Sequence, residues 1–131
     1  MNLVSLKHLS GRAFNITIGQ HQLTSDAAPD EGGHDAGPGS IELFAASMGA
    51  CMGAYIATYC QTANLPHEGM EIDIVCDLLT EPKRIGGITI DITMPEGFPQ
   101  NRRKAVERAA QSCSVHNTLH NPPEISIEVV D

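Results

Sequence analysis

The sequence has no tryptophan, and only two tyrosines and three phenylalanines among its 131 residues. This scarcity excludes a core of large aromatic side chains, so Ile, Leu, Val, Met and Ala must form the core. Hydrophobic residues make up 41% of the chain, which is ordinary for a globular protein. The length predicts one domain spanning residues 1–131. A chain this short buries a modest fraction of its surface, which is compatible with an obligate partner subunit.

Basic residues are also few. Eight Lys and Arg against sixteen Asp and Glu give a net charge of −8, which argues against nucleic acid and anionic membranes as partners. The opening segment MNLVSLKHLS lacks the apolar region of a signal peptide, and no apolar run approaches the roughly 20 residues of a membrane span. We therefore expect a soluble, cytoplasmic protein. Its four cysteines would be core residues, redox groups or metal ligands rather than structural disulfides.

Hydrophobic periodicity predicts strands and helices in the order βββ–α–ββ–α–β. Alternating patterns predict strands at residues 2–8, 13–18, 21–26, 70–79, 88–94 and 124–130. Recurrence at three and four residues predicts helices at 40–61 and 101–113, and the Gly-rich segment 27–40 predicts a long loop. Antiparallel strands with helices packed on one side give an α+β fold class.

The first predicted helix places Cys51 between Gly49 and Gly53, in the stretch ASMGACMGAY. Ser40 is a suitable N-cap for this helix, and Glu42 lies in its first turn. Each glycine weakens a helix by about 1 kcal/mol relative to alanine. That cost is tolerable where another group must come close to Cys51, and the small residues of this helix would allow such an approach.

Cys51 and Cys113 allow two interpretations. A free cysteine in a helix is often a small buried hydrophobe. Alternatively, packing of the two helices could bring the pair within disulfide range, at a Cα separation of about 4.4–6.8 Å. One thiolate would then attack the O–O bond of a peroxide and the other would resolve the sulfenic acid. The attacking thiolate needs a nearby cation, and the candidates are Arg12, Arg84, His34 and His116.

A metal site is a further alternative, because Cys113 and His116 form a C-x-x-H pair. His34 and Asp35 in the loop could complete a set of four ligands. The signal is weak, since no second pair follows at zinc-finger spacing. The remaining cysteines, Cys60 and Cys76, are interpreted as core residues.

Two segments carry a family resemblance. GGHDAGPGSIELFAASMGAC, followed by CSVHNTL about sixty residues later, resembles the OsmC/Ohr family of bacterial thiol peroxidases over nearly the whole chain. The resemblance implies an OsmC-like fold, an intertwined homodimer with antiparallel sheets around buried central helices. It also implies reduction of organic hydroperoxides by a dithiol reductant in oxidative-stress defence, and we expect no cofactor and no resident metal.

By position in that family, Cys51 matches the peroxidatic cysteine, Cys113 the resolving one and Arg12 the arginine that holds the thiolate. The family's acid that orients the arginine corresponds to Ile41 here, and Glu42 follows one residue later, rotated by about 100° on a helix. Family enzymes also place proline after the second cysteine, where this chain has Ser114. These departures keep open a non-catalytic dimer that binds a small apolar ligand in the thiol pocket, or the metal site.

Overall fold

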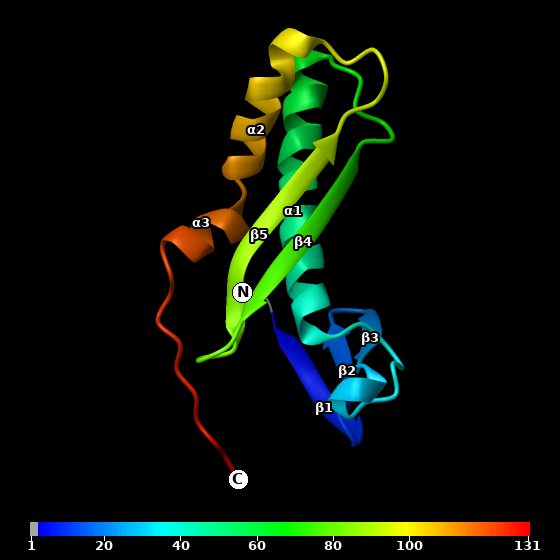
Figure 1. Ribbon diagram of the computed structural model, residues 1–131, viewed down its shortest axis with the longest axis vertical. Coiled ribbons are helices and arrows are strands. Elements are labelled where there is room, and N and C mark those ends of the chain that lie inside the picture. The colour runs from blue at the N-terminus through cyan, green and yellow to red at the C-terminus, as the bar shows by residue number, and fades with distance from the viewer. Residues whose placement is uncertain (1–2) are drawn as a thin grey trace. The chain divides into compact units, whose positions relative to one another are not determined.

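A computed structural model describes residues 3–131 of the chain (Figure 1). It divides into two compact units, Met1–Ala45 and Ala46–Asp131, which are described in turn. Helix α1 (Ser40–Ala63) begins in the first unit and continues through the second. The first residue of the strand predicted at 2–8 lies outside the described residues. The assignment of residues 1–131 to one domain stays a prediction.

The first unit contains a three-stranded antiparallel sheet. Its strands are β1 (Val4–Ser10), β2 (Ala13–Ile18) and β3 (His21–Ser25), in that order across the sheet. Gly11 and Gly19 occupy the two connecting turns with φ of 53° and 58°, a backbone conformation that glycine adopts without steric cost. Ile16, at the centre of β2, is buried. The predicted N-terminal meander is therefore confirmed.

The segment between β3 and α1 is organised around a buried carboxylate. Asp26 accepts hydrogen bonds from the backbone amides of Ala27 at 2.7 Å, His34 at 3.1 Å and Ala36 at 3.1 Å. These donors, with Ala27 the strongest, lower the pKa of Asp26. The predicted loop thus closes on Asp26, and it includes a short 3₁₀ helix, η1 (Pro29–Glu31).

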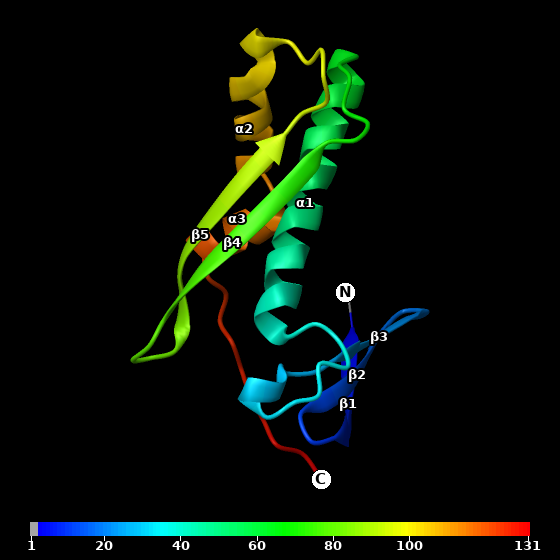
Figure 2. The same cartoon turned by 45° about the vertical axis from the view of Figure 1, so that its right-hand side comes forward.

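The second unit packs helices against a β-hairpin. The hairpin consists of β4 (Glu71–Leu79) and β5 (Arg84–Thr93), followed by η2 (Gln100–Arg102), α2 (Arg103–Gln111) and α3 (Ser114–His120). Figures 1 and 2 both show α1 and α2 behind the hairpin, on the same face. The core of this unit comes mainly from the two helices, through Met48, Met52, Ile56, Cys60, Val106 and Ala110.

The two glycines beside Cys51 permit close packing between α1 and β4. A Cβ atom at Gly49 would lie 2.9 Å from Cδ1 of Ile74, and one at Gly53 would lie 3.2 Å from Cδ1 of Ile72. Both separations are shorter than an ordinary van der Waals contact between carbon atoms. The group that approaches the glycines from the sheet is therefore strand β4, and Cys51 lies between these two contact points along the helix.

Two predictions about secondary structure are wrong, the first of them in part. The helix predicted at 101–113 is interrupted: α2 ends at Gln111, and α3 begins after Cys113. The strand predicted at 124–130 is not formed, since residues 122–131 have no regular secondary structure. Its alternating Ile125, Ile127 and Val129 are 82%, 89% and 96% exposed, because no described strand pairs with this segment.

The expectation that no stretch could span a membrane is also wrong as stated. Helix α1 is long and apolar enough to do so by length and composition alone. A core helix passes the same test; Gly49 and Gly53 of α1 lie close to β4, and 28% of the apolar window is buried within this single chain.

Candidate thiol site

Cys51 and Cys113 come together in the second unit. Cys51 lies midway along α1 and is half-buried, whereas Cys113 precedes α3 and is completely buried. Each thiol shifts the pKa of the other, so the two side chains lie near each other, and both are free thiols. The structure thus places side by side the two cysteines that the sequence singled out, while their catalytic roles stay a prediction.

The break between α2 and α3 positions Cys113. Its backbone is extended, with φ of −66° and ψ of 145°, and its Sγ accepts a hydrogen bond from the backbone amide of His116 at 3.2 Å. A side chain that accepts from the amide three residues later is the N-cap arrangement, which satisfies one of the free N–H groups of a helix start. The cysteine therefore lies between the two helices and caps the second, which fixes the direction of its thiol.

Ser114 supplies the main polar contact of Cys51. Its Oγ lies 3.4 Å from the Sγ of Cys51. The pKa of Cys51 is lowered first by this hydroxyl and then by the backbone amide of Val115. Both groups donate hydrogen bonds that favour the thiolate over the thiol. The sequence analysis noted Ser114 only because family enzymes have proline at that position, so its contact with the Cys51 thiol was not predicted.

Burial has the opposite effect on the second thiol. The pKa of Cys113 is raised, chiefly because burial disfavours the charged form, and the adjacent Cys51 raises it further. The two sulfurs are therefore chemically unequal: the more accessible thiol ionises more readily, and the buried one keeps its proton.

Arg12 and Glu42, the charged residues compared with the family's arginine and acid, lie in the first unit. A Cβ atom at Gly32 would lie 3.1 Å from Nε of Arg12, so this side chain packs over the glycine. Glu42 accepts a hydrogen bond from the backbone amide of Gly39 at 2.9 Å, which is the glutamate half of a capping box. Arg12 and Glu42 form no ion pair with each other in the part of the chain that the structure describes. Cys51 belongs to the second unit, and the structure does not place the two units relative to each other. The roles of Arg12 and Glu42 at the thiol therefore stay predictions.

The other candidate cations have different contacts. Arg84 donates to the carbonyl of Pro82 at 2.9 Å. The ring of His116 contacts His120, and its backbone amide, not its ring, meets Cys113. Across residues 3–131, no group of three His, Cys, Asp or Glu side chains is placed to hold a metal ion. The four-ligand site considered for Cys113, His116, His34 and Asp35 would need residues of both units, so it stays a prediction.

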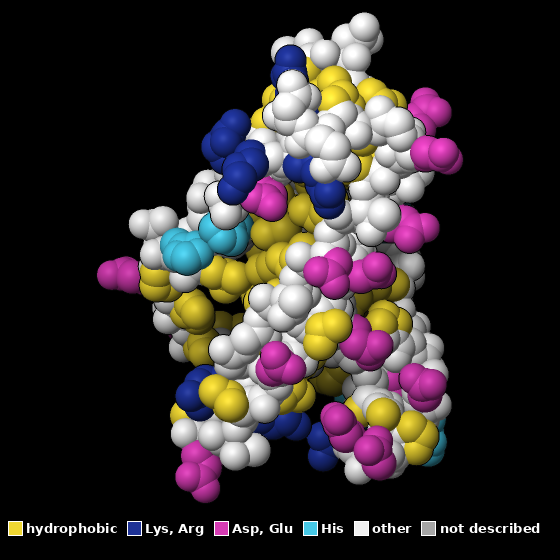
Figure 3. Space-filling view, turned by 45° about the horizontal axis from the view of Figure 1, so that its top comes forward, with side chains coloured by type: hydrophobic (Ala, Val, Ile, Leu, Met, Phe, Trp, Pro, Cys, Tyr) yellow, Lys and Arg dark blue, Asp and Glu magenta, His cyan; other side chains and the backbone are white. Residues whose placement is uncertain are grey.

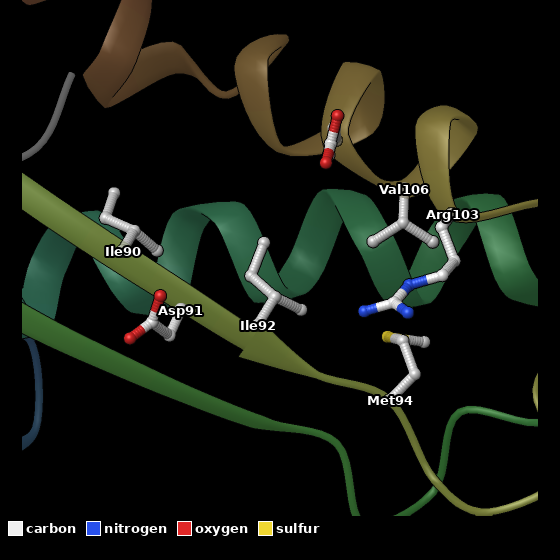
Figure 4. A pocket seen from close by; sticks show the side chains of 7 residues that line it. Ile90, Asp91, Ile92, Met94, Arg103 and Val106 are labelled. Atoms are coloured by element: carbon white, nitrogen blue, oxygen red, sulfur yellow. The ribbon is translucent and has the colours of Figure 1, made fainter.

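A cavity of about 250 Å³ lies between β5 and α2, away from the thiols. Ile90, Ile92, Met94 and Val106 form its apolar wall, and Figure 4 shows the guanidinium of Arg103 beside Met94. Neither Cys51 nor Cys113 lines it. This cavity does not favour the alternative of an apolar ligand bound in a thiol pocket.

Comparison with known proteins assigns both cysteines to one family region. Residues 32–128, which include Cys51 and Cys113, match the model of a family described as OsmC-like protein. No curated protein matches the chain in sequence.

Solved structures share the fold. A protein from Psychrobacter arcticus 273-4 superposes with a TM-score of 0.83 at 18% identity, covering 90% of this chain and 88% of that one. An OsmC like protein from Mycoplasma pneumoniae gives 0.75 at 17%, covering 93% and 87%. An organic hydroperoxide resistance protein OsmC from Legionella pneumophila gives 0.66 at 19%, covering 91% and 88%. The predicted α+β fold with antiparallel sheets is thereby confirmed.

Proposed function

Since the chain belongs to the OsmC-like protein family, we propose that it is a thiol-dependent reductase of organic hydroperoxides. The observation that carries the proposal is the proximity of Cys51 and Cys113, whose pKa values are shifted in opposite directions. The Legionella relative of the same fold, described as an organic hydroperoxide resistance protein, agrees with this substrate class. In this proposal Cys51, whose pKa is lowered, is the attacking thiol, and Cys113, whose pKa is raised, is the resolving one.

In the first step, the Cys51 thiolate attacks one oxygen of the hydroperoxide, and the O–O bond breaks. The sulfur is oxidised to a sulfenic acid, while the other oxygen leaves as an alkoxide and takes a proton to become the alcohol. The hydroxyl of Ser114 and the amide of Val115 stabilise the thiolate before the attack. Cys113 does not compete for peroxide, because its raised pKa keeps it protonated.

In the second step, the sulfur of Cys113 displaces the hydroxyl from the Cys51 sulfenic acid. An S–S bond forms, the S–O bond breaks, and the hydroxyl leaves as water with the proton of Cys113. A dithiol reductant then opens the disulfide by thiol–disulfide exchange and becomes oxidised itself. This cycle needs no bound cofactor. A cytoplasmic location, where thiols are kept reduced, is part of the proposal.

The proposal includes a homodimer, supported by apolar surface that this single chain leaves exposed. Ala46, Ala50 and Ala54 recur every four residues on α1 and are exposed, so a second helix could pack closely there. The segment 124–130 keeps its alternating apolar residues unpaired. Figure 3 shows hydrophobic side chains that reach the surface among the charged ones. A second copy of the chain would bury both surfaces if its helix packs on the alanines and one of its strands pairs with 124–130.

Peroxide consumption by the purified protein tests the proposal. With cumene hydroperoxide and dithiothreitol, the wild-type protein should turn over repeatedly, and Cys51→Ser should abolish turnover. Cys113→Ser should still form the Cys51 sulfenic acid but fail to produce the intramolecular disulfide. Cys76→Ser is the matched control, since this half-buried cysteine of β4 has no role in the scheme. Full activity of Cys51→Ser, or no consumption by the wild-type protein with any dithiol, would refute the assignment.

A further inference from the structure

Helix α3 carries two histidines one turn apart. His116 and His120 are separated by four positions, which places them on the same face of a helix. Their Nε2 atoms lie 3.2 Å apart, and the ring centroids are 4.4 Å apart with planes tilted by 52°. The two ring nitrogens thus lie within hydrogen-bonding distance of each other.

Burial fixes the orientation of the inner ring. His116 is half-buried, and its Nδ1 is fully buried without a hydrogen-bond partner among the described residues. With Nδ1 enclosed, the opposite nitrogen faces outward toward His120, which is exposed. Packing therefore holds Nε2 of His116 in place, and the exposed ring can adjust to meet it.

We propose that His116 and His120 form a two-ligand site for a divalent transition-metal cation such as Ni²⁺, Cu²⁺ or Zn²⁺. Imidazole nitrogens bind such ions at about 2.0–2.1 Å. Two nitrogens at that distance and 3.2 Å apart subtend an angle of about 100° at the cation. This value lies between the square-planar and tetrahedral angles that these ions adopt.

Helix α3 itself contains no Lys or Arg, whereas the preceding α2 carries Arg103, Lys104 and Arg108 with one acid, Glu107. Two histidines at a spacing of four on one helix are also the arrangement by which other helices hold zinc.

The site differs from a closed structural zinc site in two respects. The described residues offer no third His, Cys, Asp or Glu ligand, so water would fill the remaining positions. Binding through Nε2 also places the ring proton of His116 on Nδ1, where no described residue accepts it. We therefore expect weaker binding than at a site with four protein ligands. The bound cation would join successive turns of α3, a helix too short to be stable alone.

Calorimetric titration of the untagged, reduced full-length protein with Ni²⁺ tests the site. The wild-type protein should bind one ion per chain and melt at a higher temperature with Ni²⁺ than without. His120→Gln, a change at an exposed position, should keep the fold and lower the affinity by about tenfold or more, as loss of a ligand contact does. His21→Gln, at an exposed position in the first unit, is the matched control and should bind as the wild-type protein does.

The thiols need a separate control, because they too can bind metals. The double variant Cys51→Ser/Cys113→Ser should retain Ni²⁺ binding if the imidazoles are the ligands. Lowering the pH should release the ion, since only the neutral imidazole binds metal. Unchanged affinity in His120→Gln, loss of binding in the double cysteine variant, or no binding by the wild-type protein would each overturn the proposal.

Discussion

Ser114→Ala removes the hydroxyl that lies 3.4 Å from the Sγ of Cys51. When Cys51 is ionised this hydroxyl can only donate, so its loss should destabilise the thiolate and leave the thiol nearly unchanged. The pKa of Cys51 should therefore rise in the variant. The main chain at this position, including the amides of Ser114 and Val115 that also favour the thiolate, stays in place.

The size of the effect follows from the hydrogen bond and its setting. A hydrogen bond to a charged group contributes about 1.5–3 kcal/mol. Cys51 is only half-buried and keeps its other donors, so the lower end of that range applies. About 1.4 kcal/mol corresponds to a tenfold change in an equilibrium constant. At a fixed pH below the pKa, Ser114→Ala should therefore contain up to about tenfold less Cys51 thiolate.

The assay is the rate of iodoacetamide alkylation at Cys51 as a function of pH, read by mass spectrometry of the Cys51 peptide. The alkylation profile of Ser114→Ala should move to higher pH, and Ser114→Thr, which keeps the hydroxyl, should restore it. Ser112→Ala is the matched control, because the Ser112 hydroxyl donates to the carbonyl of Arg108 at 2.9 Å and not to the thiol. If Ser114→Ala and the wild-type protein share one profile, the hydroxyl does not stabilise the thiolate and our reasoning is refuted.

Three further predictions concern packing, pH and assembly. Gly49→Ala should lower the free energy of unfolding by about 0.5–1.5 kcal/mol less in an Ile74→Val background than in the wild-type protein, because valine lacks the Cδ1 atom that lies 2.9 Å from the new methyl group. If urea unfolding shows that the effects of the two substitutions simply add, this prediction is contradicted. The pKa of Asp26 is lower in the folded protein than in the unfolded chain. The ionised carboxylate therefore stabilises the fold at pH values above the pKa of the unfolded chain, and this stabilisation is lost as the pH falls through the pKa of the folded state. Asp26→Asn should therefore destabilise at neutral pH, and the difference should vanish in strong acid; a difference independent of pH would contradict it. Deletion of residues 124–131 should weaken self-association in sedimentation velocity, whereas an unchanged oligomeric state would exclude this segment from the interface.

Local periodicity was enough to predict the meander of β1–β3 and the β4–β5 hairpin, because adjacent strands alternate and pair through short turns. Strand 124–130 was predicted from the same alternation and is not formed. A strand needs a pairing partner, and the alternation of apolar residues within a segment does not show which strand it pairs with. The division between α2 and α3 was missed for a related reason: Cys113 acts as a cap through a three-dimensional contact with the amide of His116.

The site shows the same limits. Glycines 49 and 53 indicated a close approach to the first helix, yet only the structure identifies strand β4 as the partner. The pairing of Cys51 with Cys113 was an alternative from the residues and became specific through the family resemblance. Ser114 could have been found by asking what a hydroxyl directly after the second cysteine would contact. Its distance from Cys51 depends on how α3 is oriented, which a linear pattern does not determine.

The most direct test of the account is to treat the reduced protein with less than one equivalent of an organic hydroperoxide and map its disulfides by peptide mass spectrometry. We predict one product, an intramolecular bond between Cys51 and Cys113, with Cys60 and Cys76 still as thiols. Oxidation of Cys51 to sulfinic or sulfonic acid while Cys113 stays free, or a disulfide that involves Cys60 or Cys76, would contradict it.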